Sequence, residues 1–464
     1  MKIYFMFLIP FYLFSKNIIS VSKIDDLKYV DKDKIVFLRS ERGGYFEYNK
    51  KYLSVNNHCT IFNGWIRKTQ KNYINIKWCG AKGDARTDDT EAFNYALKVT
   101  YNYRKQNRSL YIPSGTYIIR KKTIIPAKYQ GKKNNYLTIF GDGAYDAGQT
   151  QIYFIHPQTG NKREKIEYWI TSRIQALTIK NIRFKQIYPK GKNIYSYKPF
   201  GLLKAKTFKQ TADTDTAIIN CTFERFYTIV ENWGRGLKFT GNTASLSHTP
   251  IVLKWGKYPE FPKNIGKDST GFRAFNIVGN RFHSNGSYAI VNIGKNAKKI
   301  HSILISDNLL DVGRGIFKGV LVDGMISNTV AIMTPEPVIS LIDGSNNYQV
   351  NGLVATGNNN AKRVPNNFII LKGMQENGQF SNITLSNCKS EAINAKKALL
   401  DNIIFSNILI KNINNNQLFN FSKNKNNYIL INGLMYKGNC SIDINLKNRS
   451  NNVYLQNFIC INKN

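Results

Sequence analysis

Short runs of alternating apolar and polar residues recur along most of the chain, and most of them contain an asparagine. Examples are AIINCTF, FNIVGNRF and ILISDNLL. Alternation with a period of two predicts strands with one buried face, and asparagine tolerates the left-handed backbone of a tight turn. We therefore expect the marker asparagines to line up on one turn of successive coils; they are Asn181, Asn220, Asn242, Asn280, Asn308, Asn328, Asn387, Asn407, Asn432 and Asn457.

A second strand follows each marker in the central repeats, and spacings of about 20–30 residues between markers suit one coil of a solenoid. The second strands contain the reference residues Ile229, Ile251, Ile290, Ile316 and Val338. If these references align, the residues two positions later form one outward column. That column would contain Glu231, Leu253, Asn292, Lys318 and Ser340.

The segment that opens the repeat region predicts a helix between strands. A strand around Ile74 leads to glycines at 80 and 83, and a helix follows from Asp88 to about Tyr101. Asp88 can cap that helix, and Glu91 stands three residues later, as a capping box requires. We interpret Asp84, Asp88 and Asp89 as structural because turn and cap chemistry accounts for them.

The motifs GAKGDARTDDTEAF, LYIPSGTYII and LTIFGDG resemble the opening of the pectate-lyase-like superfamily of right-handed parallel β-helix proteins. This superfamily includes polysaccharide lyases, glycoside hydrolases and tailspike-type depolymerases. The resemblance implies an all-β fold, a single-stranded right-handed parallel β-helix with a short N-terminal capping helix. It also implies a monomer or a homotrimer that acts on a polysaccharide.

Two features of better-known members are missing from this chain, so we do not expect it to cleave pectin by either of their mechanisms. The polygalacturonase motifs NTD, DD, GHG and RIK do not occur as a set, and no cluster of acids has the spacing of a pectate-lyase calcium site. We therefore expect no metal and no cofactor, and the glycan stays undefined.

The ends of the chain suggest three segments. Residues 1–22 read as a signal peptide, because a 12-residue apolar run (3–14) is too short to span a membrane. Residues 23–73 would form an N-terminal arm or cap, and 74–464 the β-helix domain. We expect a secreted protein, extracellular, periplasmic or on the cell surface, without a membrane span.

The cysteines fit export, which permits disulfides. Cys59 with Cys79, or Cys440 with Cys460, can pair if their strands meet. Cys221 and Cys388 each follow an asparagine in a strand, which favours a buried, free thiol.

The charge is strongly positive, with 66 Lys and Arg against 29 Asp and Glu, a formal net charge of +37. Such a field concentrates polyanions near the surface. The chain contains no recognised nucleic-acid module or arginine-rich helix, so we expect an acidic polysaccharide as partner and no nucleic acid.

Two long insertions, 185–214 and 256–273, interrupt the repeat and predict a groove along the second strands. Aromatic rings in this region can stack on sugars, and basic side chains can bind carboxylates. In the alternative, Trp233 and Trp255 simply close the edge of the coil. The predicted substrate-binding residues are Trp233, Arg235, Lys254, Trp255, Tyr258 and Arg273.

Glu231 is the predicted acid or base of this groove, with Lys318 or His283 as its partner. Two reactions fit: β-elimination, which needs a base and a cation for the substrate carboxylate, and hydrolysis, which needs two carboxylates. In the alternative without a catalytic role, Glu231 forms a surface ion pair with Arg235.

The competing function is a non-catalytic glycan-binding or surface-adhesion protein on the same fold. Convergence of Glu231, His283, Lys318 and Asp343 would favour the enzyme. Scatter of these residues over several faces would favour binding.

Overall fold

The computed structural model describes residues 18–462 except 41, 70, 103–108, 126–135, 146–147, 173, 175, 206–214, 234–235, 255–273, 295–296, 358–363, 414–417, 422–427 and 439–452. The chain divides into two compact units. The first unit comprises Met1–Lys82 and Glu91–Leu110, and the second comprises Gly83–Thr90 and Tyr111–Asn464. The chain thus passes between the units after Lys82, Thr90 and Leu110, and the three segments suggested by the sequence stay a prediction.

The first unit contains a five-stranded sheet in the order β1-β2-β3-β5-β4, in which β1 and β2 are parallel and the other pairs antiparallel. Its core is the apolar side of this sheet, where Val36, Leu38, Phe46 and Trp65 are buried. The elements of this unit up to Lys82 are β1 (Ile18–Val21), η1 (Ile24–Tyr29), β2 (Ile35–Leu38), β3 (Gly44–Tyr48), η2 (Lys50–Tyr52), β4 (Ile61–Phe62), β5 (Trp65–Lys68), β6 (Tyr73–Asn75) and η3 (Ile76–Cys79).

The predicted helix is present as α1 (Thr90–Asn102). The carboxylate of Asp88 accepts a hydrogen bond from the backbone N–H of Thr90 at 3.0 Å. Because α1 begins at Thr90, Asp89 and not Asp88 stands at the N-cap, and Asp88 forms a turn immediately before it. Asp84 accepts from the backbone N–H groups of Arg86 and Thr87, and Asp89 accepts from that of Gly83. The described contacts of these three aspartates are thus of the turn and cap type.

The predicted leader overlaps an ordered strand. β1 (Ile18–Val21) pairs with β2 along its whole length, so cleavage after Ser22 would remove one strand of the first sheet. The signal peptide stays a prediction, and amino-terminal sequencing of the exported protein tests it.

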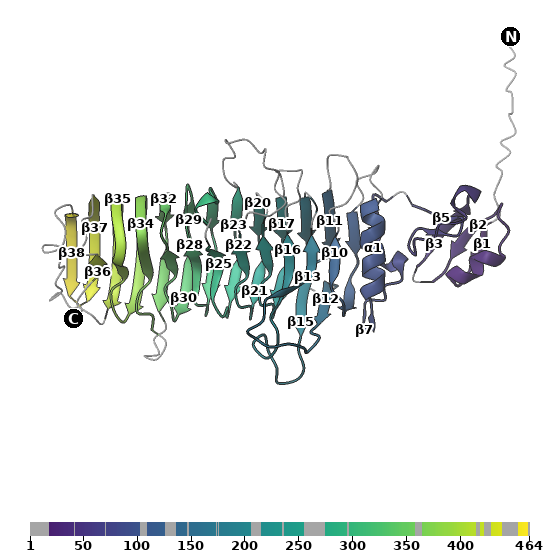
Figure 1. Cartoon of the computed structure of the whole chain (residues 1–464), viewed down its shortest axis with the longest axis horizontal. Coiled ribbons are helices and arrows are strands. Elements are labelled where there is room, and N and C mark those ends of the chain that lie inside the picture. Colours follow the sequence, from purple (N-terminus) through teal and green to yellow (C-terminus); the bar gives the residue numbers. More distant parts are fainter. Residues whose placement is uncertain are drawn as a thin grey trace, which may run out of the picture. The chain divides into compact units, whose positions relative to one another are not determined.

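The second unit is a right-handed parallel β-helix whose strands stack as successive coils, as Figure 1 shows for β13 to β38. Each coil contributes one strand to each of three parallel sheets, named A, B and C here in chain order. Sheet A contains β11 (Tyr136–Gly141), β14 (Ala176–Lys180), β17 (Asp215–Ile219), β20 (Gly236–Thr240), β23 (Phe275–Val278), β26 (Ile303–Ser306), β29 (Met325–Ser327) and β32 (Ser345–Asn351).

Sheet B follows the marker turn and contains β7 (Asp84–Asp88), β9 (Gly115–Ile119), β12 (Thr150–Ile155), β15 (Arg183–Ile187), β18 (Thr222–Glu224), β21 (Thr243–Ser245), β24 (Arg281–His283), β27 (Leu309–Asp311), β30 (Val330–Thr334) and β33 (Val354–Gly357). Sheet C contains β10 (Thr123–Ile125), β13 (Glu167–Ser172), β16 (Phe200–Ala205), β19 (Val230–Asn232), β22 (Ile251–Leu253), β25 (Tyr288–Asn292), β28 (Gly315–Gly319), β31 (Ile339–Leu341) and β36 (Phe419–Phe421).

In the last coils the strands are longer and run through the corners, as β34 (Ile369–Cys388), β35 (Ile393–Ile413), β37 (Ile429–Gly438) and β38 (Val453–Asn462) do. Two short elements complete the chain: η5 (Ala297–Lys299) and β8 (Ser109–Ile112). One boundary between the two units falls within β8, after Leu110.

Stacked side chains fill the interior of the solenoid. Phe184 and Phe223, on neighbouring coils of sheet B, lie 5.5 Å apart between ring centroids with an interplanar angle of 1°. Both rings are almost fully buried. Because equivalent residues of adjacent coils lie about 4.8 Å apart, one apolar position per coil builds a continuous core.

The marker asparagines do not occupy one equivalent position, which corrects the prediction. The left-handed corner before sheet B contains Asn181, Asn220 and Asn328, but glycine replaces asparagine there at 241 and 279. Three markers lie one residue later and point into the interior, where they form a buried ladder: Asn242, Asn280 and Asn308. Asn407 and Asn457 also have positive φ at the corner, Asn432 precedes the left-handed Gly433, and Asn387 lies five residues beyond Asn382, at a later corner.

The cysteine predictions agree with the structure where it describes them. Cys59 and Cys79 form a disulfide within the first unit, and Cys221 and Cys388 are buried and free. Cys460 is also disulfide-bonded, and its predicted partner Cys440 lies outside the described residues.

Candidate functional site

The structure changes the register of the predicted outward column on sheet C. Glu231 pairs with Val252, which pairs with Val291, and Val291 pairs with Lys318. The predicted members Leu253 and Asn292 belong to the next column, whose side chains are buried. Glu231 and Lys318 do share a column, but two strands separate them, so they lie about 14 Å apart at ~4.8 Å per strand.

Glu231 is a buried carboxylate whose oxygens already accept several donors. The hydroxyl of Tyr168 donates to Oε2 at 2.9 Å, and the indole N–H of Trp233 donates to Oε1 at 2.7 Å. The ammonium of Lys204 lies 2.8 Å from Oε1. Burial raises the pKa of Glu231, but the hydrogen bonds and the Lys204 charge outweigh it, and the net pKa is below the usual value. A general acid needs the opposite shift.

This environment predicts a role for Glu231 in stability. Glu231→Gln should lower the free energy of unfolding by about 2 kcal/mol at neutral pH, because Lys204 loses its anionic partner. A carboxylate with a lowered folded-state pKa stabilises the fold above the unfolded-state pKa of about 4.3, and this contribution disappears as pH falls through the folded-state pKa.

Urea unfolding at neutral pH and at about pH 3 measures this difference. The gap between wild type and variant should narrow at the lower pH. Glu336→Gln is the control, because the pair between Glu336 and Arg314 is exposed and should contribute little. A gap of the same size at both pH values would contradict the assigned ionisation.

The other predicted residues do not gather around Glu231. Lys318 is exposed, with its ammonium 5.6 Å from the ring centroid of Tyr288. Lys254 follows β22 and donates its backbone N–H to Asn232. Asp343 accepts the backbone N–H of Met374. Of the predicted substrate-binding residues, Arg235, Trp255, Tyr258 and Arg273 lie outside the described residues.

His283 lies on sheet B, in a different place from Glu231 and Lys318. The proposed set of Glu231, His283 and Lys318 therefore does not form one site. Together with Asp343 these residues are scattered, which by itself favours the binding protein over an enzyme that uses this set. His283 instead lines a pocket with other residues, which the sequence did not single out.

This pocket is a groove of about 430 Å³ on the outer face of sheet B. Its floor is formed by β15, β18, β21 and β24, and Ala144 and Tyr145 form one wall. The Tyr145 hydroxyl lies 3.2 Å from Oγ1 of Thr243, and the hydroxyl of Thr222 donates to the carbonyl of Ala144. The wall is thus fixed over the strands by side-chain hydrogen bonds.

His283 is oriented by an aspartate on the next coil. Its Nδ1 lies 3.0 Å from Oδ2 of Asp311, and the two residues are register partners in β24 and β27. An ionised carboxylate only accepts hydrogen bonds, so this contact places the imidazole proton on Nδ1 and leaves Nε2 as the basic nitrogen. The side chain of His283 is 40% exposed and that of Asp311 20%.

Basic side chains surround the acidic ones on this face. Glu224 lies 2.9 Å from Lys185, 3.4 Å from Arg183 and 3.6 Å from Arg225. Arg281 lies 3.3 Å from Asp311. Four cationic side chains thus accompany two carboxylates, and the face keeps a positive balance that suits an anionic ligand.

The strand spacing favours one of the two reactions considered. Glu224, Ser245, His283 and Asp311 are consecutive register partners, so Glu224 and Asp311 lie three strands, about 14 Å, apart. Glycosidase carboxylate pairs lie about 5–9.5 Å apart. This pair does not fit hydrolysis, whereas the oriented imidazole of His283, with Arg281 on the same strand, fits proton abstraction beside a carboxylate.

The sequence contained a signal for this site that the column prediction did not use. Ser245, His283 and Asp311 each stand three residues after a marker asparagine, namely Asn242, Asn280 and Asn308. No corner lies between the marker and sheet B, so this offset keeps the register. The same face also contains Arg183, Lys185 and Glu224. In their coils another residue occupies the position of the inward asparagine.

Metal-site clusters and membrane-spanning helices are both absent from the described residues. No group of three or more His, Cys, Asp and Glu side chains in them is arranged to hold a metal ion. No helix in this part of the chain is long and apolar enough to cross a membrane.

The fold and its groove define a parallel β-helix protein with a basic groove on one lateral sheet. Residues 73–242 match the family model described as rhamnogalacturonase A/epimerase, pectate lyase-like. This segment is thus similar to the pectate-lyase-like superfamily, and the parallel β-helix fold of the second unit is consistent with that likeness. No curated protein matches the sequence significantly.

Among solved structures, the Agl-KA catalytic domain is 15% identical, with 86% of this chain and 71% of that chain covered and a TM-score of 0.50. Pantoea stewartii WceF, described as a glycan biofilm modifying enzyme with a bacteriophage tailspike-like fold, is 14% identical, with 79% and 47% covered and a TM-score of 0.47. A mannuronan C-5 epimerase A-module of Azotobacter vinelandii is 12% identical, with 83% and 95% covered and a TM-score of 0.43. The chain spans about half the length of WceF.

Proposed function

We propose that the groove on sheet B binds an acidic polysaccharide and cleaves it by β-elimination, with His283 as the base. The observation that carries this proposal is the 3.0 Å contact between His283 Nδ1 and Asp311 at a groove also lined by Arg183. The family match to a pectate-lyase-like model supports action on a polysaccharide. Secretion, which the reaction on an external glycan requires, belongs to the same proposal.

In this mechanism the residues of sheet B have separate roles. Arg281, two residues before His283 on β24, neutralises the carboxylate of the reacting sugar, which acidifies the neighbouring C–H bond. Arg183 and Lys185, three strands or about 14 Å away, bind a carboxylate of a neighbouring sugar unit. His283 Nε2 removes that proton, the electron pair forms the ring double bond, and the glycosidic oxygen leaves with a proton from the medium. Asp311 fixes the imidazole and stabilises its protonated form.

The test is incubation of the full chain with uronate, sulfated and neutral glycans. Ultraviolet absorbance of the unsaturated product and reducing ends are measured together. β-Elimination raises both signals, whereas hydrolysis raises only reducing ends and would contradict the assigned reaction. No change with any acidic glycan that binds would exclude catalysis.

The second candidate is a non-catalytic glycan-binding or surface-adhesion protein. It is favoured by Glu224, which is held by three cations, and by the Thr222, Thr243 and Ser245 hydroxyls of the groove. Such a protein binds acidic glycans without producing new ends.

Both candidates predict that glycan affinity falls as salt rises, because ions screen the attraction between a +37 protein and a polyanion. Titrations at low and physiological ionic strength, with a neutral glycan as control, measure this dependence. Equal affinity at both salt concentrations for every polyanion would contradict the acidic substrate class.

A further inference from the structure

The first unit contains a cavity of its own, independent of the groove on sheet B. Its volume is about 340 Å³, and four cationic side chains and one acid are among its lining residues: Lys23, Arg42, Lys77, Lys82 and Asp25. All of them belong to the first unit. The cavity therefore lies within a single compact body, and its lining has a net positive charge.

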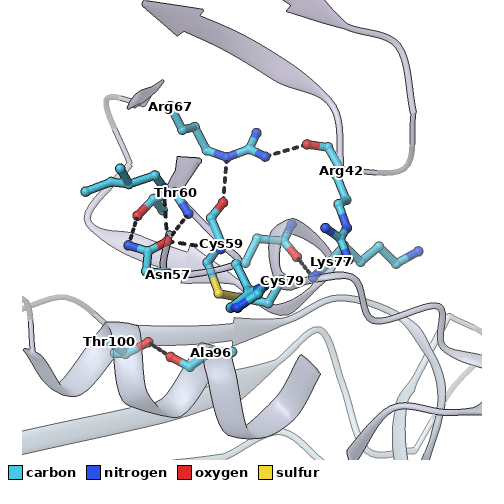
Figure 2. Close-up of a disulfide and its surroundings, with 12 residues drawn as sticks. Arg42, Asn57, Cys59, Thr60, Arg67, Lys77, Cys79, Ala96 and Thr100 are labelled. Carbon is cyan, nitrogen blue, oxygen red and sulfur yellow. Dashed lines mark hydrogen bonds between the residues drawn. A yellow bond between two sulfur atoms is a disulfide. The ribbon is translucent and has the colours of Figure 1, made fainter. Parts of the chain in front are cut away.

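A buried arginine, Arg67, fixes the backbone of the loop that contains Arg42. The guanidinium of Arg67 donates to the carbonyl oxygens of Arg42, Gly43 and Cys59, as Figure 2 shows for Arg42 and Cys59. Arg67 is 5% exposed and lies over the rings of Phe46 and Trp78. Burial, and the charge of Arg42, lower the pKa of Arg67 to about 9.

The opposite wall of the cavity is fixed by the disulfide between Cys59 and Cys79, after which Gly80 turns the chain with φ of +100°. A Cβ at Gly80 would lie only 2.1 Å from Nη2 of Arg42. The guanidinium thus packs against a backbone position that only glycine leaves free. Arg67 thus fixes the backbone at Arg42, and the disulfide fixes the chain beside Gly80, against which the guanidinium packs.

Asp25 is the carboxylate whose charge acts on the guanidinium of Arg42 in this cavity. Burial lowers the pKa of Arg42, and only Asp25 opposes the effect. No side-chain hydrogen bond of Arg42 occurs among the described contacts. A bound oxyanion would neutralise the charge of the partly buried Arg42 guanidinium, and would thereby also offset its electrostatic repulsion with Arg67.

We propose that this cavity binds an acidic sugar unit, with its carboxylate or sulfate on Arg42 and Lys77. The volume suits a sugar ring better than a bare ion, since ligand sites begin at about 300 Å³ and one water takes about 30 Å³. The first unit is then a carbohydrate-binding unit in its own right. Its ligand belongs to the same chemical class as the polyanion expected at the groove, but its site does not depend on any groove residue.

Calorimetric titration of the full chain with glucuronate, a sulfated glucose, glucose and inorganic sulfate tests the proposal. The acidic sugars should bind and glucose should not. Arg42→Gln and, separately, Lys77→Gln should each weaken this binding about tenfold, the scale of one charge-assisted hydrogen bond. Lys50→Gln is the matched control, since Lys50 is exposed on η2 and does not line the cavity.

Hydrogen exchange locates the bound sugar and separates the two sites. Acidic sugars should protect peptides covering 22–25, 40–43 and 77–82, and this protection should persist in an Arg183→Gln variant whose groove is impaired. The proposal would be overturned if these peptides were not protected, or if Lys50→Gln lost as much affinity for the acidic sugars as Arg42→Gln. It would also be overturned if glucose bound as tightly as the acidic sugars, or if inorganic sulfate did. Loss of groove binding alone leaves this site intact and counts only against the proposed function.

Discussion

His283→Ala should reduce turnover of the acidic glycan about 10²–10⁴-fold, the usual contribution of a positioned general base. Glycan affinity should change little, because Arg183 and Lys185 supply the charge that binds the substrate. The measurement is the initial rate of unsaturated product formed by variant and wild type at saturating glycan.

The chain supplies a matched control for this experiment. His301 contacts Asp323 through Nδ1 at 2.8 Å, the same type of pair as His283 with Asp311, but it does not line the groove. His301→Ala should keep full activity. A fully active His283→Ala variant would remove this residue from the mechanism and leave the groove as a binding site.

Asp311→Asn separates orientation from proton transfer. The amide can accept or donate, so it no longer fixes the proton on Nδ1. We expect an intermediate loss of kcat with little change in KM. A loss that appears only in KM would assign Asp311 to substrate binding.

The fold could be predicted because each coil repeats the same local sequence pattern. Alternating strands, turn residues that accept positive φ, and the capped helix at Thr90–Asn102 are local properties, and local properties are visible in sequence. The disulfide between Cys59 and Cys79 was one of two pairs proposed from spacing and export.

The candidate site was harder because the coils differ in the length of one corner. From sheet B to sheet C the chain takes six residues between Ser245 and Ile251 but seven between His283 and Ile290, which are equivalent positions. A one-residue change moves a side chain to the other face of its strand. The reference residues were also not equivalent, because Val230, and not Ile229, is the register partner of Ile251. Counting two positions from each reference therefore mixed outward Glu231 and Lys318 with inward Leu253 and Asn292.

A one-residue difference at another corner, the one before sheet B, divides the marker asparagines into two kinds. Asn220 occupies the left-handed corner, whereas Asn280 follows a left-handed glycine and points inward. Both kinds satisfy the motif of a strand followed by asparagine. Only the stacking of coils reveals which backbone groups each amide contacts, and that information is not local.

Asn280→Ala should lower the free energy of unfolding by about 2–5 kcal/mol, because it breaks the buried ladder in its middle. The amide of Asn280 donates to the carbonyl of Phe239 at 2.8 Å and to Oδ1 of Asn308 at 3.0 Å. Its oxygen accepts the backbone N–H of Asn242 at 2.9 Å. Alanine leaves these buried groups on the neighbouring coils without partners, and a buried unsatisfied group costs about 1–3 kcal/mol.

Asn276→Ala is the matched control, since Asn276 is an exposed asparagine of the same coil on β23. It should change stability by no more than about 0.5 kcal/mol. Denaturant unfolding followed by circular dichroism measures both variants. Equal stability of the two would show that the ladder is dispensable. A large loss confined to Asn280→Ala would show that the inward amides hold adjacent coils in register, and with them the alignment of Ser245, His283 and Asp311 on sheet B.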